Sequence, residues 1–239
     1  MKRALVGIGF FGAIASAEAA TQVFFTEFAS TIPTGISAGS AALAGVQSYA
    51  GLGPAGKQFG GSFLRSPTGN VVTLSLTGLP QHTAIDLEFL FAAIDSLDGT
   101  GTFPSGDFFK VTLDGHQVFR ESFANALPSQ IQSYVPPPGV ELARHVDLGF
   151  SGPGGFYTDS AYNLGADPVF HNLAHTGTTA VFTFQIEGEG IQDLNDESWA
   201  MDNLRVSVTA VPEPSTSLLA LAGLGALLFR RRLKVIASV

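Results

Sequence analysis

The sequence of 239 residues has no cysteine, one tryptophan, two methionines and few charged residues, which make up 13% of the chain. Without cysteine there is neither a disulfide framework nor a thiolate metal site, so any cross-link of the fold would have to come from a metal. Basic residues are scarce, with twelve lysines and arginines against twenty aspartates and glutamates. Nucleic-acid binding needs a basic surface, so the composition excludes nucleic acid as an expected partner.

The few basic residues are concentrated at the two ends of the chain. Six of the twelve lie there: Lys2, Arg3, Arg230, Arg231, Arg232 and Lys234. Six basic and nineteen acidic residues remain between positions 20 and 214, which gives that part a net charge of −13. Such an excess of carboxylates favours solubility and the binding of cations.

The N-terminal end has the features of a secretion signal. Two basic residues precede an apolar stretch over 4–14, and residues 17–19 read Ala-Glu-Ala, a small-x-small cleavage site. The pattern predicts a signal peptide over 1–19, cleaved after Ala19, with 15–17 as an alternative site. We therefore expect the chain to pass through the secretion translocon.

The C-terminal end, residues 211–239, combines three kinds of segment. Residues 211–217 contain two prolines and predict an extended linker, because proline fixes φ and disfavours helix in the residue before it. Residues 218–229 contain only leucine, alanine, glycine and one phenylalanine, and predict a short transmembrane helix. Even with the preceding Ser-Thr-Ser, this helix is roughly 22 Å long, against about 30 Å for a hydrocarbon core, which suits a transient anchor. Length alone also fits a buried helix, but the arginine triplet that opens 230–239 favours a membrane.

This tail resembles the PEP-CTERM sorting signal of exported proteins of Gram-negative bacteria. The residues that match are the tripeptide Pro212, Glu213 and Pro214 and the basic stop Arg230, Arg231 and Arg232. The resemblance implies that an exosortase, a membrane-bound cysteine transpeptidase-like enzyme, processes the tail after transient anchoring in the inner membrane. The implied final location is the cell surface or the extracellular space. Residues 233–239 continue beyond the point where most such tails end.

The region between the two ends predicts an all-β domain over 20–210. Apolar and polar residues alternate with a period of two, which is typical of strands, over 71–77, 84–94, 108–113, 117–123, 180–187 and 201–209. Asp114-Gly115 separates two of these strands and predicts a tight hairpin. Short strands with glycine- and proline-rich turns favour an antiparallel β-sandwich of jelly-roll type.

Three aspartates around a glycine turn form the densest chemical signal. Asp95, Asp98 and Asp107 surround Gly99 and Gly106. Carboxylates at this spacing can converge on one hard cation, and Ca²⁺ takes six to eight oxygen ligands. The alternative is that Asp and Gly simply favour loops, since no EF-hand spacing is present.

Three stretches of the body also resemble the same exported family: IDSLDG, GDFFKVTLDG and DESWAMDNLRVS, with Ala200 where that family usually has glycine. Related β-sandwich modules hold a structural Ca²⁺ where the first and last strands meet. The matching positions are Glu27 and Asp202, so the resemblance implies a second calcium site there. Trp199 is expected in the core, with its indole N–H hydrogen-bonded at the edge of the domain.

Signals of catalysis are weak. His171 and His175 lack the glutamate of a zinc-protease pair, so they are interpreted as loop histidines. Gly51-x-Gly53-x-x-Gly56 includes Pro54 and lacks a strand–turn–helix context, which makes it a loop. We predict no catalytic residue and no enzyme activity.

These observations predict a non-catalytic exported protein of the cell surface or extracellular matrix, associated with exopolysaccharide and stabilised by Ca²⁺. One alternative is a carbohydrate-binding, lectin-like module with exposed aromatic platforms: Tyr134, Phe156, Tyr157 and Tyr162. A further alternative is a polysaccharide-acting enzyme that uses Glu187, Glu189 or Glu197, since glycosidases work with paired carboxylates. Acids on a solvated loop explain those glutamates equally well.

Overall fold

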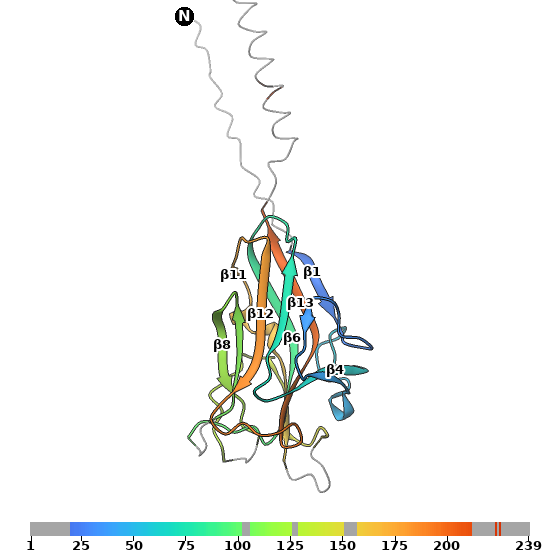
Figure 1. Ribbon diagram of the computed structural model, residues 1–239, viewed down its shortest axis with the longest axis vertical. Coiled ribbons are helices and arrows are strands. Elements are labelled where there is room, and N and C mark those ends of the chain that lie inside the picture. The colour runs from blue at the N-terminus through green and yellow to red at the C-terminus, as the bar shows by residue number, and fades with distance from the viewer. Residues whose placement is uncertain are drawn as a thin grey trace, which may run out of the picture. The chain divides into compact units, whose positions relative to one another are not determined.

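The computed structural model describes residues 20–101, 106–125, 129–150 and 157–211, together with Gly223 and Gly225. Residues 20–211 form one compact unit of two antiparallel sheets, which confirms the predicted all-β sandwich (Figure 1). The signal peptide, the transmembrane segment and the sorting residues of the tail lie outside the described residues.

The first sheet has eight strands and is built around a ladder between its two longest members, β6 and β13, which lie side by side (Figure 1). Across the sheet the order is β3 (Ala42–Gly45), β4 (Ser62–Pro67), β13 (Glu197–Ala210), β6 (His82–Asp95), β10 (Asp159–Asn163) and β9 (Glu141–Val146). Two strands complete it: β1 (Ala20–Thr26) pairs with β13, and β11 (Leu173–Ala174) pairs with β6.

The second sheet has five strands and packs against the first. Its order is β2 (Ile36–Ser37), β5 (Val72–Thr77), β12 (Thr179–Glu187), β7 (Phe108–Leu113) and β8 (His116–Ser122). Asp114 and Gly115 join β7 to β8 with φ of 50° and 80°, the left-handed conformation that a two-residue hairpin turn requires. Three short 3₁₀ helices lie in the connections: η1 (Gln47–Tyr49), η2 (Leu164–Ala166) and η3 (Pro168–Phe170).

The main core lies between the sheets and is rich in phenylalanine. The Phe91 ring is 4.3 Å from Phe109 and 4.7 Å from Phe123, measured between ring centroids. Trp199 is completely buried in the same cluster. Its indole N–H has no hydrogen-bond partner, so the expected hydrogen bond at the domain edge is wrong. The indole is held by apolar packing alone.

A second, smaller core covers the other face of the eight-stranded sheet. Tyr49, Phe59 and Leu148 pack there against the small side chains of Ala92 and Ala200. Because both faces of the sheet are covered at this level, the second half of β6 is buried without alternation. This explains why the sequence from Leu90 to Ile94 is a continuous apolar run.

Candidate cation-binding site

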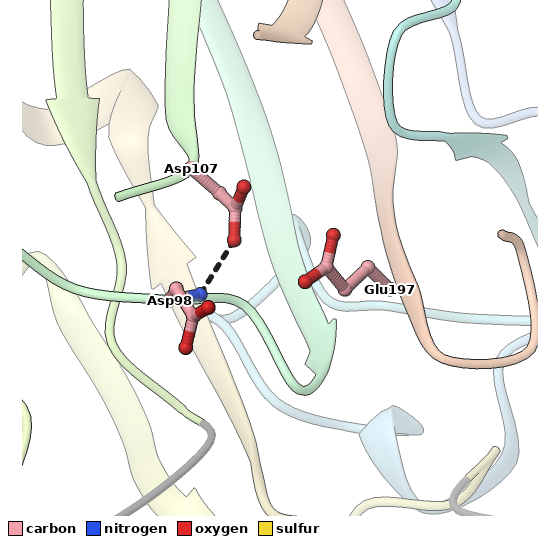
Figure 2. A group of neighbouring side chains, drawn as sticks. All are labelled: Asp98, Asp107 and Glu197. Atoms are coloured by element: carbon pink, nitrogen blue, oxygen red, sulfur yellow. Dashed lines mark hydrogen bonds between the residues drawn. The ribbon is translucent and has the colours of Figure 1, made fainter. Parts of the chain in front are cut away.

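Three carboxylates converge at the end of the sandwich where β6 ends and β13 begins. Asp98 lies in the loop after β6, Asp107 directly precedes β7, and Glu197 is the first residue of β13 (Figure 2). One carboxylate oxygen from each lies within 4.8 Å of the other two. Asp107 and Glu197 are almost completely buried, and Asp98 is partly exposed. We call these three residues the carboxylate cluster.

The two aspartates are held together by their own backbone. The Asp98 N–H donates to Asp107 Oδ2 at 2.6 Å, and the Asp107 N–H donates to the Asp98 carbonyl at 2.9 Å (Figure 2). Gln130 fixes the Asp98 side chain by donating to its Oδ1. These contacts bring residues nine apart in sequence onto one side of a single loop.

Glu197 is held separately by the loop that precedes β13. Gln192 donates to both of its carboxylate oxygens, from the backbone N–H at 2.9 Å and from the side-chain amide at 3.0 Å. Gly188 packs closely against Asp107, because a Cβ added at this glycine would lie 3.0 Å from Asp107 Oδ1. The cluster is therefore fixed by contacts that do not involve an ion.

The electrostatics of the cluster are unfavourable without a cation. Burial raises the pKa of Asp107 and of Glu197 above their usual values, and the proximity of the carboxylates to one another adds to the effect. Within the part of the chain that the structure describes, no lysine or arginine forms an ion pair with any of the three residues. Three carboxylates without an ion-paired lysine or arginine offer only oxygen ligands and uncompensated negative charge. This is the chemistry of a site for a hard cation.

The structure does not bring Asp95 into this cluster. Its carboxylate is completely buried, and Oδ2 faces Arg65 Nη2 of β4 at 4.0 Å. Both carboxylate oxygens lack a hydrogen-bond partner, and burial raises the pKa of Asp95 to about 6. The prediction grouped Asp95 with Asp98 and Asp107 from spacing alone. Asp95 is the last residue of β6, so its side chain is directed by the strand, whereas Asp98 lies on the loop beyond it.

Glu197 is the member that the calcium prediction did not include. Its Cα pairs with that of Asp95 across the β6–β13 ladder, which places the start of β13 beside the aspartate loop. The sequence shows an acidic pair before the final strand, but 90 residues separate Glu197 from Asp107. Only strand pairing shows that they meet.

The second predicted pair, Glu27 and Asp202, lines a cavity of about 570 Å³ between the end of β1 and the loop over residues 51–61. Asp202 is buried, its Oδ2 accepts from the Gly60 N–H at 3.2 Å, and burial raises its pKa to about 7. Glu27 is exposed and adds to that increase through its charge. Gln58 and Asn203 also line the cavity, and Ala29, Phe59 and several glycines complete its wall.

Two of the four proposed aromatic platforms are not surface features. Tyr134 and Tyr162 are buried in the main core, where the Tyr134 hydroxyl donates to Asp167 Oδ2 and the Tyr162 hydroxyl donates to Gln132 Oε1. Their exclusion from solvent makes the prediction of stacking platforms wrong for both. Tyr157 is partly exposed, and Phe156 lies outside the described residues.

The membrane segment predicted over 218–229 is not covered by this description, apart from Gly223 and Gly225. Within the described ranges, no helix combines the length and the apolar character needed to cross a membrane.

Comparison with known families assigns the C-terminal tail. Residues 210–233 match the PEP-CTERM protein-sorting motif. The chain is thus an exported protein of the exosortase-sorted class, with a tail that anchors transiently in the membrane. The chain carries the PEP-CTERM sorting motif in its tail, and its body is a two-sheet β-sandwich.

Comparisons of the whole chain give little more. No curated protein matches the sequence. Among solved structures, the Agl-KA catalytic domain is 12% identical with a TM-score of 0.33, and the match covers 88% of this chain and 31% of that one. The catalytic domain of a GH87 alpha-1,3-glucanase with tetrasaccharides is 13% identical with a TM-score of 0.30, over 77% of this chain and 27% of that one. This chain spans less than a third of either, and similarity this low transfers no activity.

Proposed function

We propose that this protein is a non-catalytic component of the cell surface or of an exopolysaccharide matrix, stabilised by Ca²⁺ after export. The sorting motif supports delivery to the outside of the cell. The single observation that carries the rest is the carboxylate cluster of Asp98, Asp107 and Glu197, which has three acidic groups and no basic partner among the residues described. Extracellular calcium would supply the missing charge.

Calcium fits the donor set better than other common ions. All three side chains offer oxygen, and the partial exposure of Asp98 lets water complete a shell of six to eight ligands. Mg²⁺ demands a smaller, near-octahedral arrangement, and zinc prefers nitrogen or sulfur ligands. Bound Ca²⁺ would also relieve the mutual repulsion of the carboxylates.

A melting experiment tests calcium binding. We expect millimolar Ca²⁺ to raise the melting temperature of the EGTA-treated protein by several degrees, since binding to the folded state alone stabilises it. Glu197→Gln should remove that increase, whereas Glu189→Gln, at an exposed position in the preceding loop, should preserve it. An identical melt in Ca²⁺ and in EGTA would refute the calcium proposal and leave export untouched.

Export through the tail has its own test. Deletion of 212–239 should leave the sandwich folded, because those residues lie outside the compact unit of 20–211, and should abolish outward delivery. Fractionation of cells with and without the exosortase measures the effect. Equal delivery of the truncated and the complete chain would contradict sorting through the tail.

A second candidate function is carbohydrate binding, in the cavity lined by Glu27, Asp202, Gln58 and Asn203. Carboxylate and amide side chains suit the hydroxyl groups of sugars, and a volume of about 570 Å³ is in the range of small-molecule sites. A glycan array tests the idea with the protein and with Ala29→Trp, which would fill the cavity from its exposed rim. The absence of binding at millimolar sugar, or equal binding by Ala29→Trp, would refute it.

A further inference from the structure

Two histidines face each other at the opposite end of the β6–β13 ladder from the carboxylate cluster. His82 is the first residue of β6, and His175 directly follows β11. His82 Nε2 lies 2.7 Å from His175 Nδ1, the ring centroids are 5.0 Å apart, and the ring planes differ by 13°. A nitrogen separation this short shows that the rings meet edge to edge. His82 is 2% exposed and the His175 side chain 7%.

The other nitrogen of each ring is held by an oxygen acceptor. His82 Nδ1 lies 2.6 Å from the Pro80 carbonyl oxygen, which can only accept a hydrogen bond. His175 Nε2 lies 3.1 Å from Asp114 Oδ2, and an ionised carboxylate also only accepts. Both outer nitrogens must therefore carry hydrogen. In neutral imidazole rings this leaves the two facing nitrogens as bare lone pairs.

Lone pairs 2.7 Å apart repel each other unless a positive centre lies between them. Metal-ligating histidines show this arrangement of partners, in which the outer N–H donates to a carbonyl or carboxylate that fixes the tautomer and orients the ring. We propose that His82 Nε2 and His175 Nδ1 are the protein ligands of a divalent transition-metal ion of the zinc, copper and nickel class, with Asp114 and the Pro80 carbonyl as orienting partners. Imidazole nitrogen is the ligand that these metals prefer.

The surroundings can accommodate such an ion. Two zinc–nitrogen bonds of about 2.0–2.1 Å in a tetrahedral arrangement need nitrogens roughly 3.3 Å apart, so the pair must open by about 0.6 Å. His175 begins the loop after a strand of only two residues and is held by one backbone hydrogen bond, from its N–H to the Thr83 carbonyl. It is therefore the side that can move.

Room for the remaining ligands lies beside His175. A cavity of about 250 Å³ is lined by His175, Asp114 and His116, with apolar side chains completing its wall. Water in this cavity can complete the coordination shell. His116, which is exposed and lines the same cavity, is the candidate for a third protein ligand. In the described residues, no lysine or arginine forms an ion pair with Asp114, so its charge remains available to the metal-bound His175.

A metal at this position would connect the two sheets. His82 belongs to the eight-stranded sheet, and Asp114 forms the β7–β8 turn of the five-stranded sheet, where its Oδ1 also accepts from the Val181 N–H of β12. The Cα of Ala210, the last residue of β13, pairs with that of His82. The ion would thus link the two sheets through the hydrogen bond of its ligand His175 to Asp114, beside the last residue of β13.

Spectroscopy on the complete exported protein, purified without a histidine tag and stripped with a chelator, tests the site. Co²⁺ titration should produce visible d–d absorption with a stoichiometry of one, and Cu²⁺ should give an electron paramagnetic resonance signal with nitrogen coupling. Nitrogen coupling distinguishes this site from the all-oxygen carboxylate cluster. It also keeps this proposal separable from the calcium proposal.

Variants locate the site. His82→Gln and His175→Gln should each abolish the nitrogen-coupled signal, and His171→Gln, a histidine on the other side of β11 that faces Asp86 instead, should retain it. Asp114→Asn keeps both ligands and should weaken binding by about 10- to 100-fold, as expected for an orienting partner. If the histidine variants do not fold, Asp114→Asn still tests the metal site.

Two results would overturn the proposal. One is the absence of nitrogen-coupled metal binding in the stripped protein at metal concentrations up to 100 μM (roughly the upper limit for a specific site). The other is binding that persists unchanged in both His82→Gln and His175→Gln. Nitrogen-15 spectra that show a hydrogen shared between the two rings, with no change on addition of Zn²⁺, would count as the first result.

Discussion

The two ends of the β6–β13 ladder carry opposite chemistries. At one end, where Asp95 pairs with Glu197, buried carboxylates gather without a basic partner; at the other, where His82 pairs with Ala210, two imidazole rings face each other. The ends are about 43 Å apart, at 3.3 Å for each of the thirteen steps along β6. The same pair of strands therefore presents oxygen ligands at one end and nitrogen ligands at the other, with the aromatic core between them.

This difference shows how a single ladder can serve two kinds of ion. The carboxylate cluster is held by backbone and amide donors, which satisfy oxygen atoms but leave their charge uncompensated. The histidine pair is held by acceptors, which fix hydrogen on the outer nitrogens and direct lone pairs inward. Hard cations suit the first arrangement and imidazole-binding metals suit the second.

The largest expected effect comes from a change in the aromatic core that lies between the two ends of the ladder. Trp199→Ala removes the largest fully buried side chain of the core under the ladder, and large-to-small changes of this kind cost about 3–5 kcal/mol of stability. Urea unfolding measures the loss. Trp199→Phe should cost less, because it also removes an indole N–H that has no hydrogen-bond partner. Equal losses for the two variants would contradict that reasoning.

The carboxylate end is expected to respond to calcium in a way that the histidine end does not. At a Ca²⁺ concentration 100 times Kd, the folded protein should gain about 2.7 kcal/mol of stability. Glu197→Gln should lose this gain. In EGTA at pH 8 the same variant should be more stable than the wild type, because it removes a buried negative charge from the cluster. Denaturant titrations with and without Ca²⁺ measure both effects, and His175→Gln serves as the control that keeps the calcium response.

The pH dependence should follow the buried carboxyl groups. Burial raises the pKa of Asp159 and Asp202 to about 7 and that of Asp95 to about 6, whereas unfolded aspartate titrates near 4. The folded state therefore binds protons that the unfolded state has released between pH 4 and 7. In EGTA, stability should fall as pH rises through this window and level off above it, because each of these groups contributes in the same direction. A profile that rises over the same range would contradict this assignment.

The histidine end should contribute less to stability when no metal is present. His175→Gln breaks the contacts with His82 and Asp114, and losing hydrogen bonds of this kind costs about 1 kcal/mol. Melting of the chelator-treated protein measures the change. His116→Gln, at an exposed position beside the same cavity, should stay within about 0.5 kcal/mol of the wild type. Similar losses for both variants would show that the pair has no special role.

The smallest effect is expected at the surface of the five-stranded sheet. Glu187 accepts from Arg120 at 2.8 Å and from Lys110 at 3.1 Å, and these contacts lower its pKa. The group is partly exposed and its charge is screened by water, so Glu187→Gln should cost less than about 1 kcal/mol. A loss comparable to that of Trp199→Ala would mean that these surface ion pairs contribute as much to stability as the core does.

Much of the fold could be predicted because strands and turns follow from patterns of neighbouring residues. The strands over 108–113 and 180–187 alternate with a period of two, and Asp114-Gly115 has the residues that a tight turn requires. Besides β1 to β4 and β11, the strands β9 and β10 were not predicted. Their sequences show no clear alternation, because β10 is buried on both faces and β9 is an edge strand with polar residues on both sides.

The sequence by itself determined the all-β fold class and the sorting motif of the tail, since the motif over 210–233 and the alternating strands depend only on neighbouring residues. Only the tertiary structure decided which acids and histidines meet. Glu197 joins Asp98 and Asp107, and His175 faces His82 and not His171, because antiparallel pairing brings together residues about 90 positions apart. Spacing along the chain carries no information about such contacts, whereas strand register fixes them.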